Sequence, residues 1–375
     1  MKKRFLIILV FFFILGFLAY FRFASKDNIS PLPKFNNPPS PAEVGNLQIA
    51  VIASDLDTPW AIAFLPDGNM ITTERKGSVR LIDKKDGLLE NPIFVFDDVV
   101  EKGEGGLLGV AVHPNFGANG FVYFYYTYKS SSNVFNKVVR MVFKDNSLIF
   151  DKVIVNDIPA SQNHNGGRIK FGPDGYLYIT TGDAEKPSLA QDKNSLAGKI
   201  LKVDDDGNPA TGNPFDNLVY SYGHRNPQGI TWDENGTLWA TEHGPSGLET
   251  GNDEINKIEP GKNYGWPEIR GAETKDGMVS PILESGKGNT WAPSGIAYFE
   301  GKLYFGGLRG EALYRVVFVD EKPKLETLFK GEFGRIRDVV LGPDNMLYIT
   351  TSNKDGRGRP GEKDDKIIRI NPRDL

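Results

Sequence analysis

The sequence predicts an all-β fold, a six-bladed β-propeller built from four-stranded antiparallel blades, and three observations lead to it. A motif made of a tight turn and an apolar strand recurs six times along the chain. Glycine, which tight turns often require, supplies 42 of the 375 residues, against about 7% in average proteins. After the first 22 residues, no long stretch shows the periodicity of a helix. Together these features favour many short strands joined by tight turns.

Each copy of the repeat begins with a turn that contains Gly or Asn and continues as a strand ending in small polar residues. The turns lie at residues 66–68, 119–120, 173–175, 234–236, 300–301 and 343–345. Successive copies are 52, 55, 61, 65 and 44 residues apart, and a second strand-like motif, such as SVRLID or KIIRI, follows each one. Paired β motifs at this period are typical of a propeller, in which each copy is one blade.

The ends of the repeat region predict how the ring closes. The last strand motif ends near Leu375, and the strand-like run LQIAVIA at 47–53 precedes the first repeat. If 47–53 pairs into the last blade, the ring has no open sheet edge, which proteins tend to avoid. One blade cannot bury both of its faces alone, so the blades are expected to stack around an axis. The rival architecture is a mixed sandwich or a two-domain β protein.

The first 45 residues predict a membrane anchor and a tether. Residues 1–4 form a short basic tail, and residues 5–22 are almost wholly apolar up to a final arginine. This apolar length lies at the short edge of a membrane span, and no small-residue cleavage site follows, which favours a signal anchor over a cleaved signal peptide. Residues 23–45 hold five prolines and form an extended linker. Because the basic tail stays in the cytoplasm, residues 46–375, the predicted propeller, are expected on the periplasmic or extracellular side.

Composition and charge exclude several classes of partner and site. The first 22 residues carry four positive charges and no acid, which leaves a net charge of −8 on the remainder. Such an acidic body argues against nucleic-acid binding, which needs a basic surface. The absence of cysteine excludes disulfides, lipoprotein attachment, thiolate zinc sites, iron–sulfur clusters and c-type haem. The chain also has no P-loop, EF-hand, GxSxG or HExxH motif.

Of the four histidines, His164 in QNHNGGRI is the strongest candidate for a general base. Imidazole is the usual base near neutral pH, and Asp183, at the end of the strand ITTGD, is placed to hold it in one tautomer. The alternative is a surface or capping histidine. We interpret His113, in a turn, as structural, and His224 and His243 as braces for loops.

Arginines recur in the loops where blades are expected to end. These loops, YGHRNPQG, GGLRG and GRIRD, contain Arg225 with Asn226, Arg309, and Arg335 with Arg337. Loops at one end of a propeller channel usually form its site, so these cations are expected to converge on a ligand with several carboxylates or phosphates. The alternative is that each arginine forms a solvated ion pair.

Two oxygen-rich segments are compatible with a calcium site. TEHGPSG places Gly244 and Pro245 in a turn, where backbone carbonyls can face outward, and GNDEINKIEPGKNYGWP adds Asp253, Glu254 and Tyr264. Carbonyls together with a carboxylate suit calcium, which prefers oxygen ligands. Acidic residues in turns are common, so the pattern has low specificity by itself.

Taken in order, these motifs resemble the soluble pyrroloquinoline quinone (PQQ)-dependent sugar dehydrogenases, the glucose/sorbosone dehydrogenase family. The resemblance runs from TPWAIAFLPDG at 58–68 to the C-terminus and rests mainly on GGLLGVAVHPNF, NHNGGRIKFGPDG, YGHRNPQGI, EHGP, DEIN, NYGWP and GRIRDVVLGPD. It is nearer to the aldose sugar dehydrogenase branch than to dedicated glucose dehydrogenases. It implies that aldose sugars are oxidised at the anomeric carbon to lactones and that the electrons pass to a separate acceptor.

The resemblance also implies catalytic roles. His164 would take the proton from the anomeric hydroxyl as hydride passes to the quinone, and Asp183 would orient the imidazole. Arg225 would stabilise the negative charge on the reduced cofactor, and Asn226 would contact the cofactor.

The remaining candidates would bind the cofactor and calcium. Arg335 and Arg337 match positions that hold the cofactor's carboxylates. The backbone oxygens of Gly244 and Pro245 would ligate the calcium that polarises the quinone. A second, structural calcium site would be formed by the last two metal candidates, Glu254 and the carbonyl of Tyr264.

Three positions depart from the glucose dehydrogenase pattern and bear on cofactor binding. Glu104 stands where a Gln contacts the cofactor, Asn163 where an Asp precedes the catalytic His, and Arg309 where a Lys sits. Glu104 adds negative charge near a negative ligand, and all three changes bear on sugar specificity. Two other functions remain open: a non-catalytic propeller that binds carbohydrate or protein, and a calcium-dependent sugar lactonase.

Overall fold

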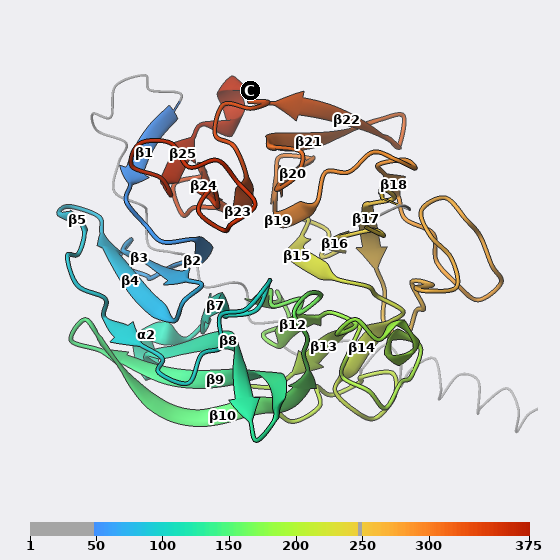
Figure 1. Cartoon of the computed structure of the whole chain (residues 1–375), viewed down its shortest axis with the longest axis horizontal. Coiled ribbons are helices and arrows are strands. Elements are labelled where there is room, and N and C mark those ends of the chain that lie inside the picture. Colours follow the sequence, from blue (N-terminus) through green and yellow to red (C-terminus); the bar gives the residue numbers. More distant parts are fainter. Residues whose placement is uncertain (1–48, 247–249) are drawn as a thin grey trace, which may run out of the picture. The chain divides into compact units, whose positions relative to one another are not determined.

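Six antiparallel sheets lie around a common axis in the computed structural model, which describes residues 49–246 and 250–375 (Figure 1). The inner strand of each sheet contacts the inner strand of the next, and the last inner strand, β23 (Ile336–Leu341), contacts the first, β2 (Pro59–Phe64), so the ring is closed. The predicted six-bladed all-β propeller is therefore confirmed for this part of the chain.

Blades 1 to 3 comprise the first half of the ring. From the axis outward, blade 1 contains β2, β3 (Met70–Glu74), β4 (Ser78–Asp83) and β5 (Gly87–Leu88), and β6 (Phe94–Val95) also pairs with β4. Blade 2 contains β7 (Leu107–Val112), β8 (Phe121–Ser130), β9 (Asn133–Lys144) and β10 (Ser147–Pro159). Blade 3 contains β11 (Ile169–Phe171), β12 (Leu177–Thr181), β13 (Lys199–Val203) and β14 (Val219–Tyr222).

Blades 4 to 6 complete the ring. Blade 4 contains β15 (Pro227–Trp232), β16 (Leu238–Glu242), β17 (Glu254–Ile258) and β18 (Leu283–Glu284). Blade 5 contains β19 (Pro293–Phe299), β20 (Lys302–Gly307), β21 (Ala312–Val319) and β22 (Lys322–Leu328). Blade 6 contains β23, β24 (Leu347–Thr351), β25 (Ile367–Ile370) and β1 (Ile49–Ala53). The short helical turns among the described residues are α2 (Phe116–Asn119), η1 (Pro187–Ala190) and η3 (Pro372–Asp374).

The N-terminal strand closes the ring, as the sequence predicts. β1 pairs antiparallel with β25, with Ile49 opposite Ile370, and so becomes the outermost strand of blade 6. Blade 6 is thus built from both ends of the propeller region (Figure 1). This pairing replaces an open sheet edge with backbone hydrogen bonds between segments more than 300 residues apart.

The small polar residues at the ends of the repeated strands connect the blades. Thr73 at the end of β3 donates its hydroxyl to the Leu108 carbonyl of blade 2 at 2.6 Å. Thr241 near the end of β16 similarly donates to the Ser294 carbonyl of blade 5 at 2.5 Å. Buried hydroxyls need such partners, so the recurring polar strand ends act as contacts between sheets that also pack through apolar clusters.

The predicted anchor at 5–22 and the linker at 23–45 lie outside the described residues. Within residues 49–246 and 250–375, no helix is long and apolar enough to cross a membrane.

Candidate functional site

Most of the candidate residues lie where inner strands begin. Glu104 precedes β7, His164 precedes β11, Arg225 precedes β15, and Arg335 precedes β23. Because every inner strand runs the same way relative to the axis, these starting points share one mouth of the ring. Hydrogen bonds between the loops of different blades, described below, show that the structure brings the residues together.

His164 and Asp183 form a hydrogen-bonded pair at this mouth. The imidazole Nδ1 lies 2.7 Å from Asp183 Oδ1, and Asp183 is fully buried. Since a carboxylate accepts, Nδ1 carries the proton and Nε2 is left as a base. His164 has a φ of +58°, a conformation that non-glycine residues adopt at a cost of about 1–3 kcal/mol and that is enriched at functional sites. The neighbouring Gly182 makes this loop position accessible, because a Cβ there would lie 2.0 Å from the His164 carbonyl oxygen.

Trp266 holds the other side of the Asp183 carboxylate, a contact that the sequence analysis missed. Its indole Nε1 donates to Asp183 Oδ2 at 2.8 Å. The ring also lies 5.4 Å from the guanidinium carbon of Arg225, within the range of a cation–π contact. The motif NYGWP contains this residue, but no local pattern indicates that it reaches the loop that follows β12 of blade 3.

Asn226 is buried and ties two loops together. Its side-chain oxygen accepts from the Gly166 N–H at 3.0 Å, and its amide nitrogen donates to Glu104 Oε2 at 3.4 Å. Glu104 Oε2 also accepts from the backbone N–H of His164 at 3.1 Å. The backbone of residues 164–166, which includes the candidate base, is therefore held by two of the predicted cofactor-binding residues.

Arg225 and Arg337 are buried cations without a carboxylate partner at hydrogen-bond distance among the described residues. Arg225 donates to the His243 carbonyl at 3.3 Å and to Ser246 Oγ at 3.4 Å, and Arg337 donates to Gln228 Oε1 at 2.6 Å. Nε of each arginine has no hydrogen-bond partner within the described part of the chain. Burial lowers the pKa of both, that of Arg337 to about 9. Such a pair is suited to an anionic ligand, which would compensate this burial.

The other two arginines differ from this pair. Arg335 is buried and forms an ion pair with Asp355, with Nε and Nη2 at 3.0 and 2.8 Å from Oδ2, so its charge is already balanced. Arg309 is exposed, and among the described residues it makes no ion pair or side-chain hydrogen bond. Of the four arginines, Arg225 and Arg337 therefore carry the uncompensated charge.

The four predicted metal ligands line one small cavity. Gly244, Pro245, Glu254 and Tyr264 surround a space of about 10 Å³, together with Glu242 and Trp266, which is room for about one water molecule. The residues predicted for two separate calcium sites therefore line one and the same cavity, and their role as ligands stays a prediction. Within residues 49–246 and 250–375, no three His, Asp or Glu side chains form a metal cluster.

Buried carboxylates surround this cavity. Glu242 and Glu254 are paired across β16 and β17, a position where like charges repel. Burial, with the charge of Glu242, raises the pKa of Glu254 to about 8. Asp253 is instead used structurally, because Oδ1 accepts from the Gly244 N–H at 2.9 Å and Oδ2 from three donors around Trp291. Glu254 is thus the carboxylate that a cation in this cavity would neutralise.

Two of the remaining histidines, His224 and His113, have structural side-chain contacts. His224 is fully buried between Ser221 Oγ and Glu242 Oε2, both at 2.8 Å, and its ring stacks on Tyr264. His113 lies 2.9 Å from Asp205. Burial lowers the pKa of His243 to about 4, so this ring is neutral at pH 7.

Arg357 is a cation of the site that the sequence analysis missed. Its Nη1 donates to Glu104 Oε1 at 2.9 Å, and its Nη2 donates to Asn163 Oδ1 at 3.0 Å. Burial alone would raise the pKa of Glu104, but the charge of protonated His243, followed by the hydrogen bond and charge of Arg357, lowers it to about 2. The extra negative charge expected at Glu104 is therefore present but paired.

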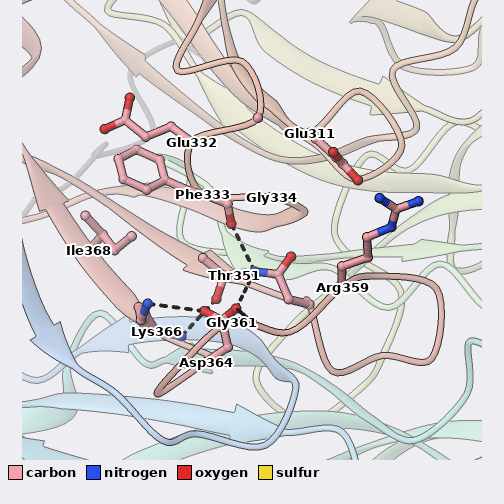
Figure 2. A pocket seen from close by; sticks show the side chains of 12 residues that line it. Glu311, Glu332, Phe333, Gly334, Thr351, Arg359, Gly361, Asp364, Lys366 and Ile368 are labelled. Atoms are coloured by element: carbon pink, nitrogen blue, oxygen red, sulfur yellow. Dashed lines mark hydrogen bonds and ion pairs between the residues drawn. The ribbon is translucent and has the colours of Figure 1, made fainter.

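A larger cavity of about 340 Å³ lies between blades 5 and 6, beside the loop that carries Arg357. Figure 2 shows Glu311 and Arg359 on one side of it and Asp364 with Lys366 on the other. Asn353 lines this cavity and accepts from the Arg335 N–H at 2.9 Å, so the cavity adjoins the site without containing the His164 pair.

Comparison with known proteins supplies the family. The profile of the glucose/sorbosone dehydrogenase family matches residues 56–368. Aldose sugar dehydrogenase of Escherichia coli K12 is 31% identical over 372 residues, which is 88% of this chain and 95% of that protein.

Solved structures agree with this match. A structure from Thermus thermophilus, described as an oxidoreductase (glucose dehydrogenase), is 43% identical, with a TM-score of 0.80 over 86% of this chain and 99% of the other. The PQQ-bound aldose sugar dehydrogenase of Streptomyces coelicolor is 39% identical, with a TM-score of 0.79 over 86% and 97%. These findings confirm the resemblance inferred from the motifs.

Proposed function

This chain belongs to the glucose/sorbosone dehydrogenase family, and on that premise we propose that it oxidises aldose sugars at the anomeric carbon to lactones and passes the electrons to a separate acceptor. It is an oxidoreductase with PQQ as its cofactor, as its relatives indicate. The observation that carries the sugar-oxidising proposal is the His164–Asp183 pair, set beside two buried, uncompensated arginines.

The residues of the mouth fit a tricarboxylate cofactor. Arg225 and Arg337 are buried, and each has an unpartnered Nε. An isolated buried cation is costly unless an anion pairs with it, so an anionic ligand would remove a penalty that the protein otherwise bears. These two arginines would hold the carboxylates or quinone oxygens of PQQ, and Arg335, Arg309 and Asn226 would lie at its periphery.

The cavity beside Glu254 fits a calcium ion in its donor chemistry. Carbonyl and carboxylate oxygens are the ligands that calcium prefers, and a cation would offset the burial and the repulsion from Glu242 that raise the pKa of Glu254. We propose Gly244, Pro245, Glu254 and Tyr264 as the residues that hold calcium. Bound there, calcium would act as a Lewis acid beside the cofactor.

His164 would act as the general base. Asp183 keeps the proton on Nδ1, so Nε2 accepts the proton of the anomeric hydroxyl. PQQ, when bound, supplies the two-electron acceptor for the hydride that leaves the anomeric carbon. Loss of this proton and hydride converts the cyclic aldose to its lactone. Asp183, held by Trp266, would stabilise the imidazolium that results, and Arg225 would stabilise the negative charge on the reduced cofactor.

The cellular location is part of the proposal. We propose that residues 5–22 are a signal anchor that holds the propeller outside the cytoplasmic membrane, so that the sugar is oxidised there. Membrane fractionation of the full chain and of a variant lacking residues 1–22 tests this. Release of the full chain by salt alone would contradict it.

One titration tests the function. We expect the purified full chain to reduce an artificial electron acceptor with aldoses only after PQQ and calcium are added, and the PQQ absorbance to shift on binding. His164→Ala should retain the absorbance shift and lose turnover, because the base does not hold the cofactor. Absence of both binding and turnover across a broad panel of sugars would overturn the proposal.

A further inference from the structure

Arg357 connects three blades at the mouth of the ring. It lies in the loop between β24 and β25 of blade 6, and its two terminal nitrogens reach Glu104 of blade 2 and Asn163, which precedes blade 3, at 2.9 and 3.0 Å. Asn163 is adjacent in sequence to His164. The guanidinium therefore contacts the residue that precedes the candidate base, although it is 194 residues from Asn163 in the sequence.

The contacts of Asn163 fix the orientation of this group. Its side-chain oxygen accepts from Arg357, and its Nδ2 donates to Glu185 Oε1 at 3.0 Å. Glu185 Oε2 also accepts from the Asn163 N–H at 3.3 Å and from the Ser161 hydroxyl. An amide at position 163 serves both partners, because an Asp there would place a second carboxylate against Glu185. Glu104, Arg357, Asn163 and Glu185 are thus linked in this order by hydrogen bonds, and we refer to these four residues as the polar wall.

This wall retains hydrogen-bonding capacity that faces solvent. The Arg357 side chain is 51% exposed, and Glu185 is exposed. A guanidinium has five N–H donors, of which the contacts above use two. Glu185 supplies carboxylate acceptors at the other end. Alternating exposed donors and acceptors suit a ligand that carries several hydroxyl groups.

The charge of the wall selects against an anionic ligand. The environment of Glu104 lowers its pKa to about 2, and the hydrogen bonds of Asn163 and Ser161 help to lower that of Glu185 against the effect of burial. Both carboxylates are therefore ionised at pH 7, and with Arg357 the wall has a net charge of −1. A neutral polyol meets no net repulsion there, whereas a sugar acid does.

We propose that Arg357, Asn163 and Glu185 form the subsite that binds the hydroxyl groups of the sugar remote from its anomeric carbon, with Arg357 as its specificity-determining residue. This rests on the proposed function, because the sugar must place its anomeric hydroxyl at His164 and so lies against Asn163. The subsite accepts neutral aldoses and disfavours uronates of the same size.

Arg357→Met tests the subsite, because it keeps the length of the side chain and removes its donors. Arg359→Met is the matched control: Arg359 is an exposed arginine of the same loop that lines the neighbouring cavity (Figure 2) and has no ion pair within the described residues. With PQQ and calcium present, we expect KM for a neutral hexose to rise about tenfold or more in Arg357→Met, since hydrogen bonds to charged groups are strong. kcat should change less than about threefold, and both constants should stay within about twofold of wild type in Arg359→Met. An unchanged KM in Arg357→Met overturns the proposal.

Two further measurements separate this role from cofactor binding and from loss of fold. PQQ titration by absorbance should give Arg357→Lys the affinity of wild type, while the single ammonium, which cannot reach both partners, leaves a raised KM for the sugar. If Arg357→Lys loses PQQ affinity and keeps its KM, the residue serves the cofactor and the proposal fails. Calorimetric titration of sugar into PQQ-free protein needs no turnover, so weaker binding in Arg357→Met would support the subsite even if the proposed oxidation failed.

Glu185→Gln tests the charge argument separately. It changes the net charge of the wall from −1 to 0 and preserves an acceptor for Asn163. The ratio of kcat/KM for a uronate to that for the neutral aldose is expected to rise about fivefold or more, and the effect should diminish at high salt. An unchanged ratio would refute selection by charge.

Discussion

Replacing Asp183 by Asn removes one charge from the site while preserving the shape of the side chain, and the structure predicts the orientation of the new amide. Asp183 Oδ1 accepts from His164 Nδ1 and the Glu185 N–H at 2.7 and 2.8 Å, and Oδ2 accepts from Trp266 Nε1 at 2.8 Å. The amide oxygen is expected to keep the first two donors. Its NH2 group then faces the Trp266 N–H, so two hydrogen-bond donors point at each other in the protein interior and neither has an acceptor there.

The expected loss follows from this arrangement. His164 keeps a hydrogen-bond acceptor but loses a charged one, which contributes about 1.5–3 kcal/mol. If that loss falls on the transition state, kcat should decrease about 10- to 150-fold. His164→Ala should lose more, up to the roughly 10²–10⁴-fold contribution of a general base. The assay is steady-state reduction of an artificial acceptor at saturating PQQ, calcium and sugar.

Trp266→Phe provides the discriminating control. It removes the indole N–H, so the amide introduced at position 183 no longer meets a second donor. We expect the double variant Asp183→Asn, Trp266→Phe to lose less activity than the product of the two single fold-losses and less stability than the sum of the two single losses in free energy, because the two residues are in contact. Additive losses, or a kcat of Asp183→Asn within threefold of wild type, would refute the orienting role of this carboxylate.

Three other predictions concern charge at the mouth. Arg337→Met should stabilise the cofactor-free protein by about 1–3 kcal/mol in urea denaturation, because a buried cation without a carboxylate partner is removed. Its affinity for PQQ should fall at least about tenfold. A destabilised variant would contradict the interpretation of Arg337 as an uncompensated cation. Glu104 has a lowered pKa of about 2 when folded, against 4.5 in the unfolded chain. The stability that it contributes is present above pH 4.5 and is lost as the pH falls towards 2. The difference in free energy of unfolding between wild type and Glu104→Gln, measured by urea denaturation, should therefore shrink over this interval. A difference that is constant with pH would argue against this role of Glu104. Glu254→Gln should raise the calcium concentration for half-maximal activity about tenfold or more without changing KM for the sugar, whereas equal calcium dependence would exclude Glu254 as a ligand.

Local patterns in the sequence were sufficient for the fold. The Gly- or Asn-containing turns and the paired strand motifs occur once per blade, so counting them predicts six blades, and the apolar run at 47–53 predicts the strand that closes the ring. Each of these signals is carried by neighbouring residues whose periodicity depends on burial. The membrane anchor at 5–22 rests on the same kind of signal and remains a prediction.

The candidate site could be predicted only in part. His164, Asp183 and Arg225 lie in short, unusual motifs, and these motifs resemble those of the glucose/sorbosone dehydrogenase family. Arg357 lies in a polar loop that looks like many others, and its partners are 253 and 194 residues away in the sequence.

The sequence by itself therefore determined the propeller, its closure, its family and the identity of the candidate base, because these depend on local patterns that repeat or match. Only the tertiary structure decided that Glu104 is paired, that Arg225 and Arg337 carry the uncompensated charge, and that the four metal candidates share one cavity. These properties depend on which loops of different blades meet at the mouth. Burial and charge pairing there are sums over residues that are distant in the chain, and no local periodicity encodes them.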